Sequence, residues 1–219
     1  VPTMATSING LPLATLFFSV LLFESSYLCQ SVPGIYTFGD SLVDVGNNNF
    51  LSDSMLKADF PYNGIDFPTG KATGRFSNGK NAADFLAEKV GLPTAPPYLA
   101  LVSSDSQRKL NDSTNAMVTG VSFASGGAGI LNGTNEAFEP IPLTQQVEYY
   151  SIVHNQLIQD VGLACANTHL AKSLFVIVIG SNDLLTYFDK DSQVSKQYTP
   201  RQYVDLMAST LKQLMKEFP

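Results

Sequence analysis

The apolar run from Ser173 to Ile179 constrains the fold of this chain more than any other feature. Between Leu174 and Ile179 every residue is apolar, so both faces of a strand at this position would be hydrophobic. Such a run is typical of a strand buried in a parallel sheet, because a strand with one wet face alternates apolar and polar residues. Small polar residues end the run at Gly180-Ser181-Asn182-Asp183. The sequence therefore predicts an α/β sheet that contains this strand.

Two further apolar runs end in the same way. The run from Gly34 to Phe38 predicts a first strand, followed by Gly39-Asp40-Ser41. The run from Ala116 to Ala124 predicts a second strand, followed by Ser125-Gly126-Gly127. Helical patterns alternate with these strands, at 81–90, 142–161 and 199–218. This alternation predicts a doubly wound parallel sheet, with all three polar strand ends at the edge where such folds bind ligands.

The last helix should begin with a capping box, because Thr199 and Gln202 have the required spacing and Pro200 suits the first helical position. One apolar face is expected to pack on the sheet. Its members are Val204, Met207, Leu211, Leu214, Met215 and Phe218.

Size and charge limit the possible functions. The 219 residues can form one domain with a substantial core, and we find no repeat or linker that would divide residues 32–219. A net charge of −6 argues against a nucleic-acid partner, because phosphates would be repelled.

The N-terminal region has the pattern of a targeting segment. The apolar run Leu11–Phe23 is too short to span a bilayer as a helix but suits the core of a signal peptide. We therefore predict that residues 1–31 are a short leader plus a signal peptide, with Val1-Pro2-Thr3 as translated leader, and that the protein is secreted without a transmembrane anchor. The alternative is a buried first helix, since neither Lys nor Arg precedes the apolar run.

Secretion gives meaning to two other patterns. Asn111-Asp112-Ser113 and Asn132-Gly133-Thr134 are sequons, so Asn111 and Asn132 are candidate glycosylation sites. Removal of Cys29 with the signal peptide would leave Cys165 without a partner in this chain.

Ser41 is a candidate nucleophile, because a Gly turn delivers its hydroxyl at a strand end. An attacked carbonyl oxygen also needs hydrogen-bond donors. The N–H of Ser41, a backbone N–H from Gly126 or Gly127, and the side-chain amide of Asn182 would together form an oxyanion hole. The residue pattern indicates neither a metal nor a cofactor.

Three other motifs are incomplete. The stretch from Gly74 to Asn81 nearly matches a phosphate-binding loop, but it lacks the final Ser or Thr and follows a loop rather than a strand. The glycines from Gly126 to Gly129 lack the third glycine of a dinucleotide-binding fingerprint. A Gly-x-Ser-x-Gly nucleophile elbow fails at Ala124.

From Tyr36 onward the chain resembles the secreted GDSL esterase/lipases of plants, within the SGNH hydrolases. Four motifs carry the resemblance. They are Phe38–Asn49, Thr73–Lys80, Phe123–Leu131 and Ile179–Asp183, with Ser122 in place of the usual Asn.

The resemblance implies a three-layer α/β/α domain of flavodoxin-like order and the hydrolysis of small-molecule or lipid esters. It implies that Ser41 is the nucleophile. Gly126 or Gly127 would be the backbone oxyanion donor and Asn182 the side-chain donor.

One family motif is missing from this sequence. The family carries a catalytic Asp and His in an Asp-x-x-His motif, and neither His154 nor His169 has an Asp three residues earlier. His154 is expected to pack in an apolar helix face, and His169 to lie at the wrong end of the sheet. We therefore interpret the chain as the N-terminal part of a hydrolase domain; the alternative is an inert truncated isoform, or a relative that binds acyl or glycan ligands.

This interpretation carries an expectation about the sheet. In the usual 2-1-3-4-5 strand order, the strand at 173–179 would have a bare apolar edge. We expect the 219-residue chain alone to be poorly soluble and essentially inactive.

Overall fold

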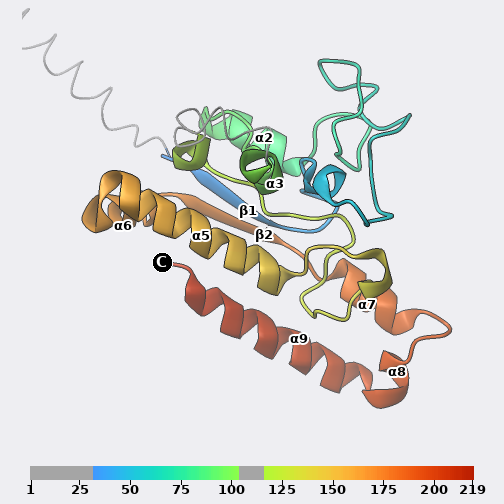
Figure 1. Cartoon of the computed structure of the whole chain (residues 1–219). Helices are drawn as coiled ribbons and strands as arrows, with labels where there is room; N and C mark the ends of the chain where they lie inside the picture. Colours follow the sequence, from blue (N-terminus) through green and yellow to red (C-terminus); the bar gives the residue numbers. More distant parts are fainter. Residues whose placement is uncertain (1–31, 104–115) are drawn as a thin grey trace, which may run out of the picture. The chain divides into compact units, whose positions relative to one another are not determined.

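The computed structural model describes residues 32–103 and 116–219, which belong to one compact unit, Val32–Pro219 (Figure 1). The predictions for the signal peptide, for Cys29 and for the Asn111 sequon lie outside the described residues. Helices cover both faces of a small parallel sheet, so this unit is an incomplete α/β fold. The predicted fold class is confirmed.

Two of the three predicted strands form the sheet. Strand β1 (Ile35–Gly39) pairs in parallel with β2 (Leu174–Val178), with Ile35 opposite Leu174 and Gly39 opposite Val178. Every residue of β1 is buried, whereas β2 is half-buried along its whole length. The sequence predicted that β2 is fully buried, and the structure shows that it is only half-buried. Among the described residues, only β1 pairs with β2, so the other edge of β2 is uncovered.

The prediction of a strand over 116–124 is wrong in its first half. Residues 116–119 form a helical turn, and the chain becomes extended after Gly120. Gly120 has φ 128°, and a Cβ there would lie 1.9 Å from the Ile35 carbonyl oxygen, so glycine lets the backbone approach β1. An apolar run does not distinguish a helical turn from a strand over so few residues.

The second half of that segment does run beside β1. The Thr37 N–H donates to Val121 O at 3.0 Å, and the Phe123 N–H donates to Thr37 O at 2.7 Å. Both groups of Thr37 point away from β2, because successive residues of a strand direct their N–H and C=O to opposite sides. The spatial order is therefore the segment 121–125, then β1, then β2, in agreement with the start of the predicted order.

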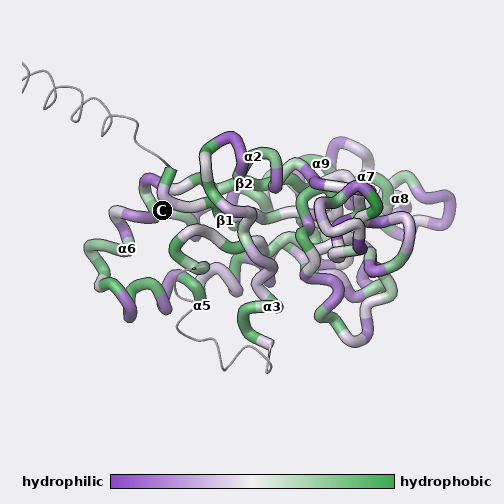
Figure 2. Tube along the Cα trace, turned by 90° about the horizontal axis from the view of Figure 1, so that it is seen from above, coloured by the Kyte–Doolittle hydropathy of each residue, from purple (hydrophilic) through white to green (hydrophobic). Residues whose placement is uncertain are grey.

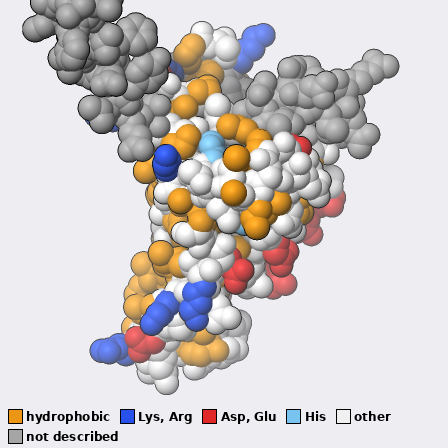
Figure 3. Space-filling view, turned by 90° about the vertical axis from the view of Figure 1, so that its left-hand side faces the viewer, with side chains coloured by type: hydrophobic (Ala, Val, Ile, Leu, Met, Phe, Trp, Pro, Cys, Tyr) orange, Lys and Arg blue, Asp and Glu red, His pale blue; other side chains and the backbone are white. Residues whose placement is uncertain are grey.

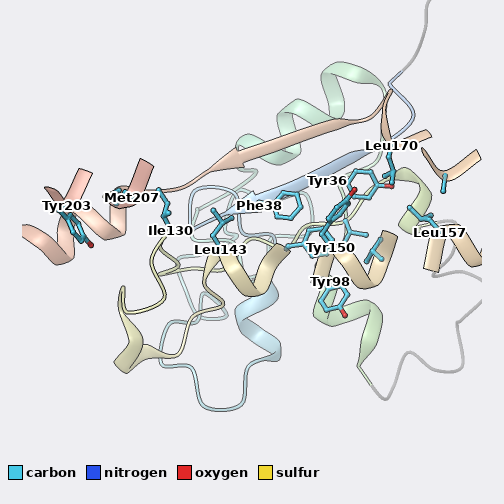
Figure 4. Close-up of a cluster of buried hydrophobic side chains, with 14 of the residues drawn as sticks. Tyr36, Phe38, Tyr98, Ile130, Leu143, Tyr150, Leu157, Leu170, Tyr203 and Met207 are labelled. Atoms are coloured by element: carbon cyan, nitrogen blue, oxygen red, sulfur yellow. The ribbon is translucent and has the colours of Figure 1, made fainter. Parts of the chain in front are cut away.

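Helix α5 (Leu143–Val161), helix α6 (Leu163–Leu170) and helix α9 (Pro200–Leu214) lie on one face of the sheet, and helix α2 (Ala82–Val90) lies on the other (Figure 1). Alternate residues of β1 face the first group. Tyr36 and Phe38 belong to a large apolar cluster with Tyr150 of α5, which Figure 4 shows in close-up. A smaller cluster that includes Ala83 of α2 packs against Val178 on the opposite face. The two cores follow from the period-two alternation of strand side chains.

Capping boxes define the start of two helices, of which the one at Thr199 was predicted. Asn81 and Asp84 form a capping box at the start of α2, and Gly91 ends that helix in the left-handed conformation. Thr199 and Gln202 form the predicted box at α9. Val204 of α9 and Met215, in the 3₁₀ turn that follows α9, are exposed, so the predicted apolar face is wrong at these two positions.

The remaining elements are short. They are the 3₁₀ turns η1 (Asn47–Phe50), η3 (Glu136–Phe138) and η4 (Met215–Glu217), and the helices α3 (Tyr98–Val102), α7 (Ser181–Phe188) and α8 (Val194–Gln197). The turn that joins α7 to α8 is strongly hydrophilic (Figure 2). In the part of the chain that the structure describes, no helix combines the length and the hydrophobicity that a bilayer crossing requires.

Apolar side chains are exposed on the side where Figure 1 draws α6 and the C-terminus (Figure 3). Val161, Leu163 and Met215 are among the exposed large hydrophobic residues. The described residues leave the outer edge of β2 unpaired, as the expected strand order requires. An unpaired strand edge next to exposed apolar side chains favours aggregation.

Candidate active site

Hydrogen bonds join the predicted strand ends at the carboxyl edge of the sheet. The N–H of Ser125 donates to Gly39 O at 3.0 Å and ties the 121–125 segment to the end of β1. The Ser181 hydroxyl, at the start of α7, donates to Asp40 Oδ2 at 2.8 Å. The end of β1 therefore contacts both of the other polar segments directly.

Ser41 lies in the tight turn that follows β1. Its side chain is half-buried, and no described residue forms a hydrogen bond with its hydroxyl. Asp40 shapes this turn: its carbonyl accepts the N–H groups of Val43 and Asp44, and its buried carboxylate accepts the N–H of Leu42 at 3.0 Å. The turn therefore holds the Ser41 hydroxyl beside the sheet edge without engaging it.

Gln146 of α5 holds the residue at which that turn begins. Its Oε1 accepts the Gly39 N–H at 2.8 Å, and its Nε2 donates to Gly39 O at 2.9 Å and to Ile141 O at 2.8 Å. The side chain is fully buried. Our sequence reasoning missed Gln146. A polar residue next to Leu143 and Val147, inside an apolar helix face, was the available signal.

Asp44 links the Ser41 turn to the glycine loop. Its Oδ1 accepts the N–H groups of Gly46 and Asn47 at 2.7 and 2.8 Å, and its Oδ2 accepts the Gly126 N–H at 2.9 Å. The Gly126 N–H is therefore already hydrogen-bonded within the protein. Asn48 fixes the same loop, since its side-chain amide donates to Gly126 O at 2.9 Å.

Gly127 differs from Gly126 in what its backbone contacts. No described residue accepts the Gly127 N–H. Its φ of 87° favours glycine, and a Cβ at this position would lie 2.3 Å from Leu56 Cδ1. The Gly126 N–H is thus engaged by Asp44, whereas the N–H of the buried Gly127 has no acceptor among the described residues.

The side chain of Asn182, in the first turn of α7, is half-buried at the same edge. Its Nδ2 donates to Ala128 O at 2.9 Å, and a primary amide has a second hydrogen that can be donated elsewhere. The adjacent Asp183 is fully buried and accepts the N–H groups of Ile130 and Leu131 at 2.9 and 3.0 Å. Asp183 thus anchors α7 to the loop that follows Gly127.

His169 lies near the start of β1, at the other end of the sheet, and His154 packs against Tyr150, each as predicted. His169 Nε2 is 3.4 Å from the Tyr36 hydroxyl, near the start of β1, where it also faces Gly34. The His154 ring stacks on Tyr150 with centroids 5.9 Å apart, and its buried Nε2 has no hydrogen-bond partner among the described residues. Neither ring is placed to take a proton from Ser41.

Of the two predicted sequons, the one at Asn132 is described. Asn132 is exposed, and its Oδ1 accepts a hydrogen bond from the Thr144 hydroxyl. Thr134 of the same sequon is buried, and its hydroxyl donates to Asp183 at 2.7 Å. Cys165 is exposed on α6 and has a free thiol. Glycosylation at Asn132 stays a prediction.

The near match to a phosphate-binding loop has a structural use. Arg75, the second residue of that stretch, is buried and binds the Asp84 carboxylate through Nε at 2.7 Å and Nη2 at 2.8 Å. Burial alone would raise the pKa of Asp84, but the hydrogen bonds and the charge of Arg75 hold that pKa below its usual value. Arg75 Nη1 also donates to Val45 O at 3.3 Å, so the loop braces the chain next to Asp44.

Asp44 is expected to titrate near neutral pH. Its burial raises the pKa to about 6, and the hydrogen bonds from Gly46, Gly126 and Asn47 lower the pKa without offsetting the burial. A folded-state pKa above the unfolded value means that protonation favours the folded state. Protonation of Asp44 should therefore raise the free energy of unfolding by about 3 kcal/mol relative to its value at higher pH. This contribution should be complete below about pH 4 and lost as the pH rises to about 6. Side-chain carboxyl NMR of Asp44 and unfolding measured across this range would check it.

The matched variant is Asp44→Asn, which cannot ionise and should remove this pH dependence. The titration of Asp84 does not obscure that of Asp44. The pKa of Asp84 is lowered, so its contribution to the free energy of unfolding is lost as the pH falls, and this happens at lower pH than the Asp44 transition. An Asp44 carboxyl that titrates below about pH 4 would contradict the prediction.

Within residues 32–103 and 116–219, we find no group of three or more His, Cys, Asp or Glu side chains arranged to hold a metal ion.

Sequence comparison matches residues 35–219 to the family described as GDSL-like lipase/acylhydrolase.

Several plant proteins are similar to the chain. GDSL esterase/lipase At5g55050 of Arabidopsis thaliana is 47% identical over 219 residues, which cover 95% of this chain and 57% of that protein. GDSL esterase/lipase At5g37690 of the same species is 40% identical, over 80% of this chain and 48% of that protein. The anther-specific proline-rich protein APG of Brassica napus is 38% identical, over 75% of this chain and 36% of that protein. The chain thus spans about half the length, or less, of these relatives.

Proposed function

Because this chain belongs to the GDSL-like lipase/acylhydrolase family, we propose that the protein it represents hydrolyses carboxylic esters with Ser41 as the nucleophile. One observation supports this most strongly. The unbonded Ser41 hydroxyl lies in the turn after β1, which hydrogen bonds tie to the segments that carry Gly127 and Asn182. A nucleophile beside convergent N–H donors is the arrangement that acyl transfer requires.

The proposed roles follow from which groups are free. Attack by Ser41 Oγ on the ester carbonyl would place negative charge on the carbonyl oxygen, which N–H donors stabilise. We assign these donors to the Ser41 N–H, the Gly127 N–H and the Asn182 amide. Gly127 is preferred to Gly126 because Asp44 already accepts the Gly126 N–H at 2.9 Å.

The general base is not one of the two histidines of this chain. His169 lies near the start of β1 and His154 stacks on Tyr150. The chain covers 57% of the relative to which it is 47% identical. We propose that it is the N-terminal part of a secreted hydrolase domain, that residues 1–31 are its leader and signal peptide, and that an Asp-x-x-His segment of the complete protein supplies the base.

A second candidate function is an inert truncated isoform, or a relative that binds acyl or glycan ligands without hydrolysing them. The positions of His154 and His169 fit this candidate as well as the first, since neither ring provides a base for Ser41. Sequencing the mature transcript past codon 219 separates the two. An in-frame Asp-x-x-His supports the hydrolase, and an in-frame stop codon supports the inert isoform.

A fluorophosphonate probe tests the assignment of Ser41. The protein encoded by the whole transcript should be labelled once per chain, on the peptide that contains Ser41, and should hydrolyse esters. Ser41→Ala should abolish both. The 219-residue chain alone should react slowly, because without a general base only about 10³–10⁴-fold catalysis over water remains. Labelling of the complete protein on a different serine would overturn the assignment.

A further inference from the structure

The loop that follows η1 forms one side of an open, solvent-accessible cavity at the carboxyl edge of the sheet. Its volume is about 690 Å³, which is within the range of ligand sites. Figure 1 shows this segment looping out beside the end of β1. The cavity is lined by Met55, Leu56, Lys57, Phe60, Pro61, Tyr62, Asn63, Phe76, Ser77 and Asn78.

Two residues that line the cavity, Phe76 and Leu56, pack closely against Gly126 and Gly127. A Cβ at Gly126 would lie 2.2 Å from Phe76 Cε2, and a Cβ at Gly127 would lie 2.3 Å from Leu56 Cδ1. The Asn48 amide also holds both structures, since it donates to Leu56 O at 2.8 Å and to Gly126 O at 2.9 Å. The cavity wall and the candidate oxyanion loop are therefore one connected unit.

The chemistry of the lining indicates an apolar occupant. Three of the polar side chains form hydrogen bonds within the loop itself: Asn63 Nδ2 donates to Phe60 O, Asn78 Nδ2 donates to the Asp66 carboxylate, and Ser77 Oγ accepts the Gly79 N–H. Lys57 is the charged residue of the lining. These three side chains are therefore partly engaged and less available to a sugar, whose hydroxyls lose hydrogen bonds to water on binding.

The apolar side chains at the cavity are, by contrast, available. Phe60 is 57% exposed, Tyr62 is 80% exposed, and Met55 is 77% exposed. Large apolar side chains gathered on one exposed loop mark a binding surface, since a ligand that covers them removes apolar area from water.

We propose that this cavity binds the acyl chain of the substrate, and that the protein prefers esters of medium and long saturated acyl chains to acetyl esters and acylated sugars with short chains. The inference rests on the proposed function, because the ester carbonyl would lie at Gly127 while the chain extends along Leu56 and Phe76. Substrate preference is then set by the residues of the 55–78 loop.

Binding of saturated fatty acids tests this without catalysis. The Ser41→Ala form of the complete protein, encoded by the whole transcript, is titrated with butanoate, octanoate and dodecanoate by calorimetry. Affinity should rise by about fourfold for each added methylene that the cavity buries, and then level off. An affinity that does not depend on chain length would overturn the proposal.

Substitution of the exposed aromatic residues that line the cavity tests whether fatty acids bind there. The double variant Phe60→Ala/Tyr62→Ala should weaken dodecanoate binding at least about tenfold and leave butanoate binding unchanged. These side chains are exposed, so the fold should survive, which circular dichroism checks. Phe188→Ala, which removes a 73% exposed aromatic ring on α7, is the matched control and should have no effect. Equal losses in both variants would contradict the assigned site.

The two proposals fail in different ways. If the complete protein is labelled at Ser41 but fatty acids bind without dependence on chain length, the acyl site is wrong and the hydrolase stands. If chain-length-dependent binding occurs but Ser41 is not labelled in the complete protein, the acyl-binding relative replaces the hydrolase.

Discussion

Replacement of Arg75 by alanine is expected to lower the free energy of unfolding by about 3–5 kcal/mol. The Arg75 guanidinium makes a bidentate ion pair with Asp84, and both side chains are almost inaccessible to solvent. Its removal leaves a buried carboxylate without its charge partner, and that loss costs far more than the net contribution of the intact pair. Urea unfolding followed by pulse proteolysis, at low protein concentration, would measure the change.

Arg201→Ala is the matched control. Arg201 also pairs with an aspartate, Asp205, at 3.3 Å, but both side chains are largely exposed. An exposed pair spaced four residues apart on a helix contributes within about 0.5 kcal/mol. Similar losses in the two variants would show that burial does not distinguish the pairs.

Gln146→Glu is expected to destabilise the fold by at least about 3 kcal/mol at neutral pH. The substitution keeps the shape of the side chain but replaces its donor by a carboxylate oxygen. That oxygen would face Gly39 O and Ile141 O, which now accept hydrogen bonds at 2.9 and 2.8 Å. A buried negative charge opposite two carbonyl oxygens is repelled, and the retained hydrogen bond from the Gly39 N–H does not offset the cost of burying it.

The same substitution at Gln159 serves as a control, because Gln159 is an exposed residue of the same helix. Gln159→Glu should change stability by less than about 0.5 kcal/mol. The loss in Gln146→Glu should shrink at acid pH, because a protonated carboxyl regains a donor. A loss that does not depend on pH would point to packing rather than charge as the cause.

Elements defined by neighbouring residues could be predicted from the sequence. The capping boxes at Asn81 and Thr199 join residues three positions apart, so their pattern is visible in a short window. The apolar run from Ser173 to Ile179 correctly indicated a parallel strand. Where a short window is ambiguous the prediction failed: residues 116–119 are helical, because Gly120 rather than the apolar pattern decides where the chain becomes extended.

The supports of the candidate site could not be predicted in this way. Gln146 binds Gly39 across 107 positions of the chain, and Asp44 binds Gly126 across 82. Such partners depend on how strands and helices pack, which a short window of sequence does not contain. The choice between Gly126 and Gly127 had to stay open for the same reason.

The sequence by itself determined the kind of sheet, the helix caps and the polar residues that end the strands, because periodicity and capping act between residues close together in the chain. Tertiary structure decided which of those polar groups are free. Buried carboxylates and amides must satisfy their hydrogen bonds, and Asp44 therefore engages the Gly126 N–H while Gly127 keeps its own. Tertiary structure also gave Arg75 its role. Its buried carboxylate partner, Asp84, lies on α2, and the loop that carries Arg75 contacts this helix only in the folded chain.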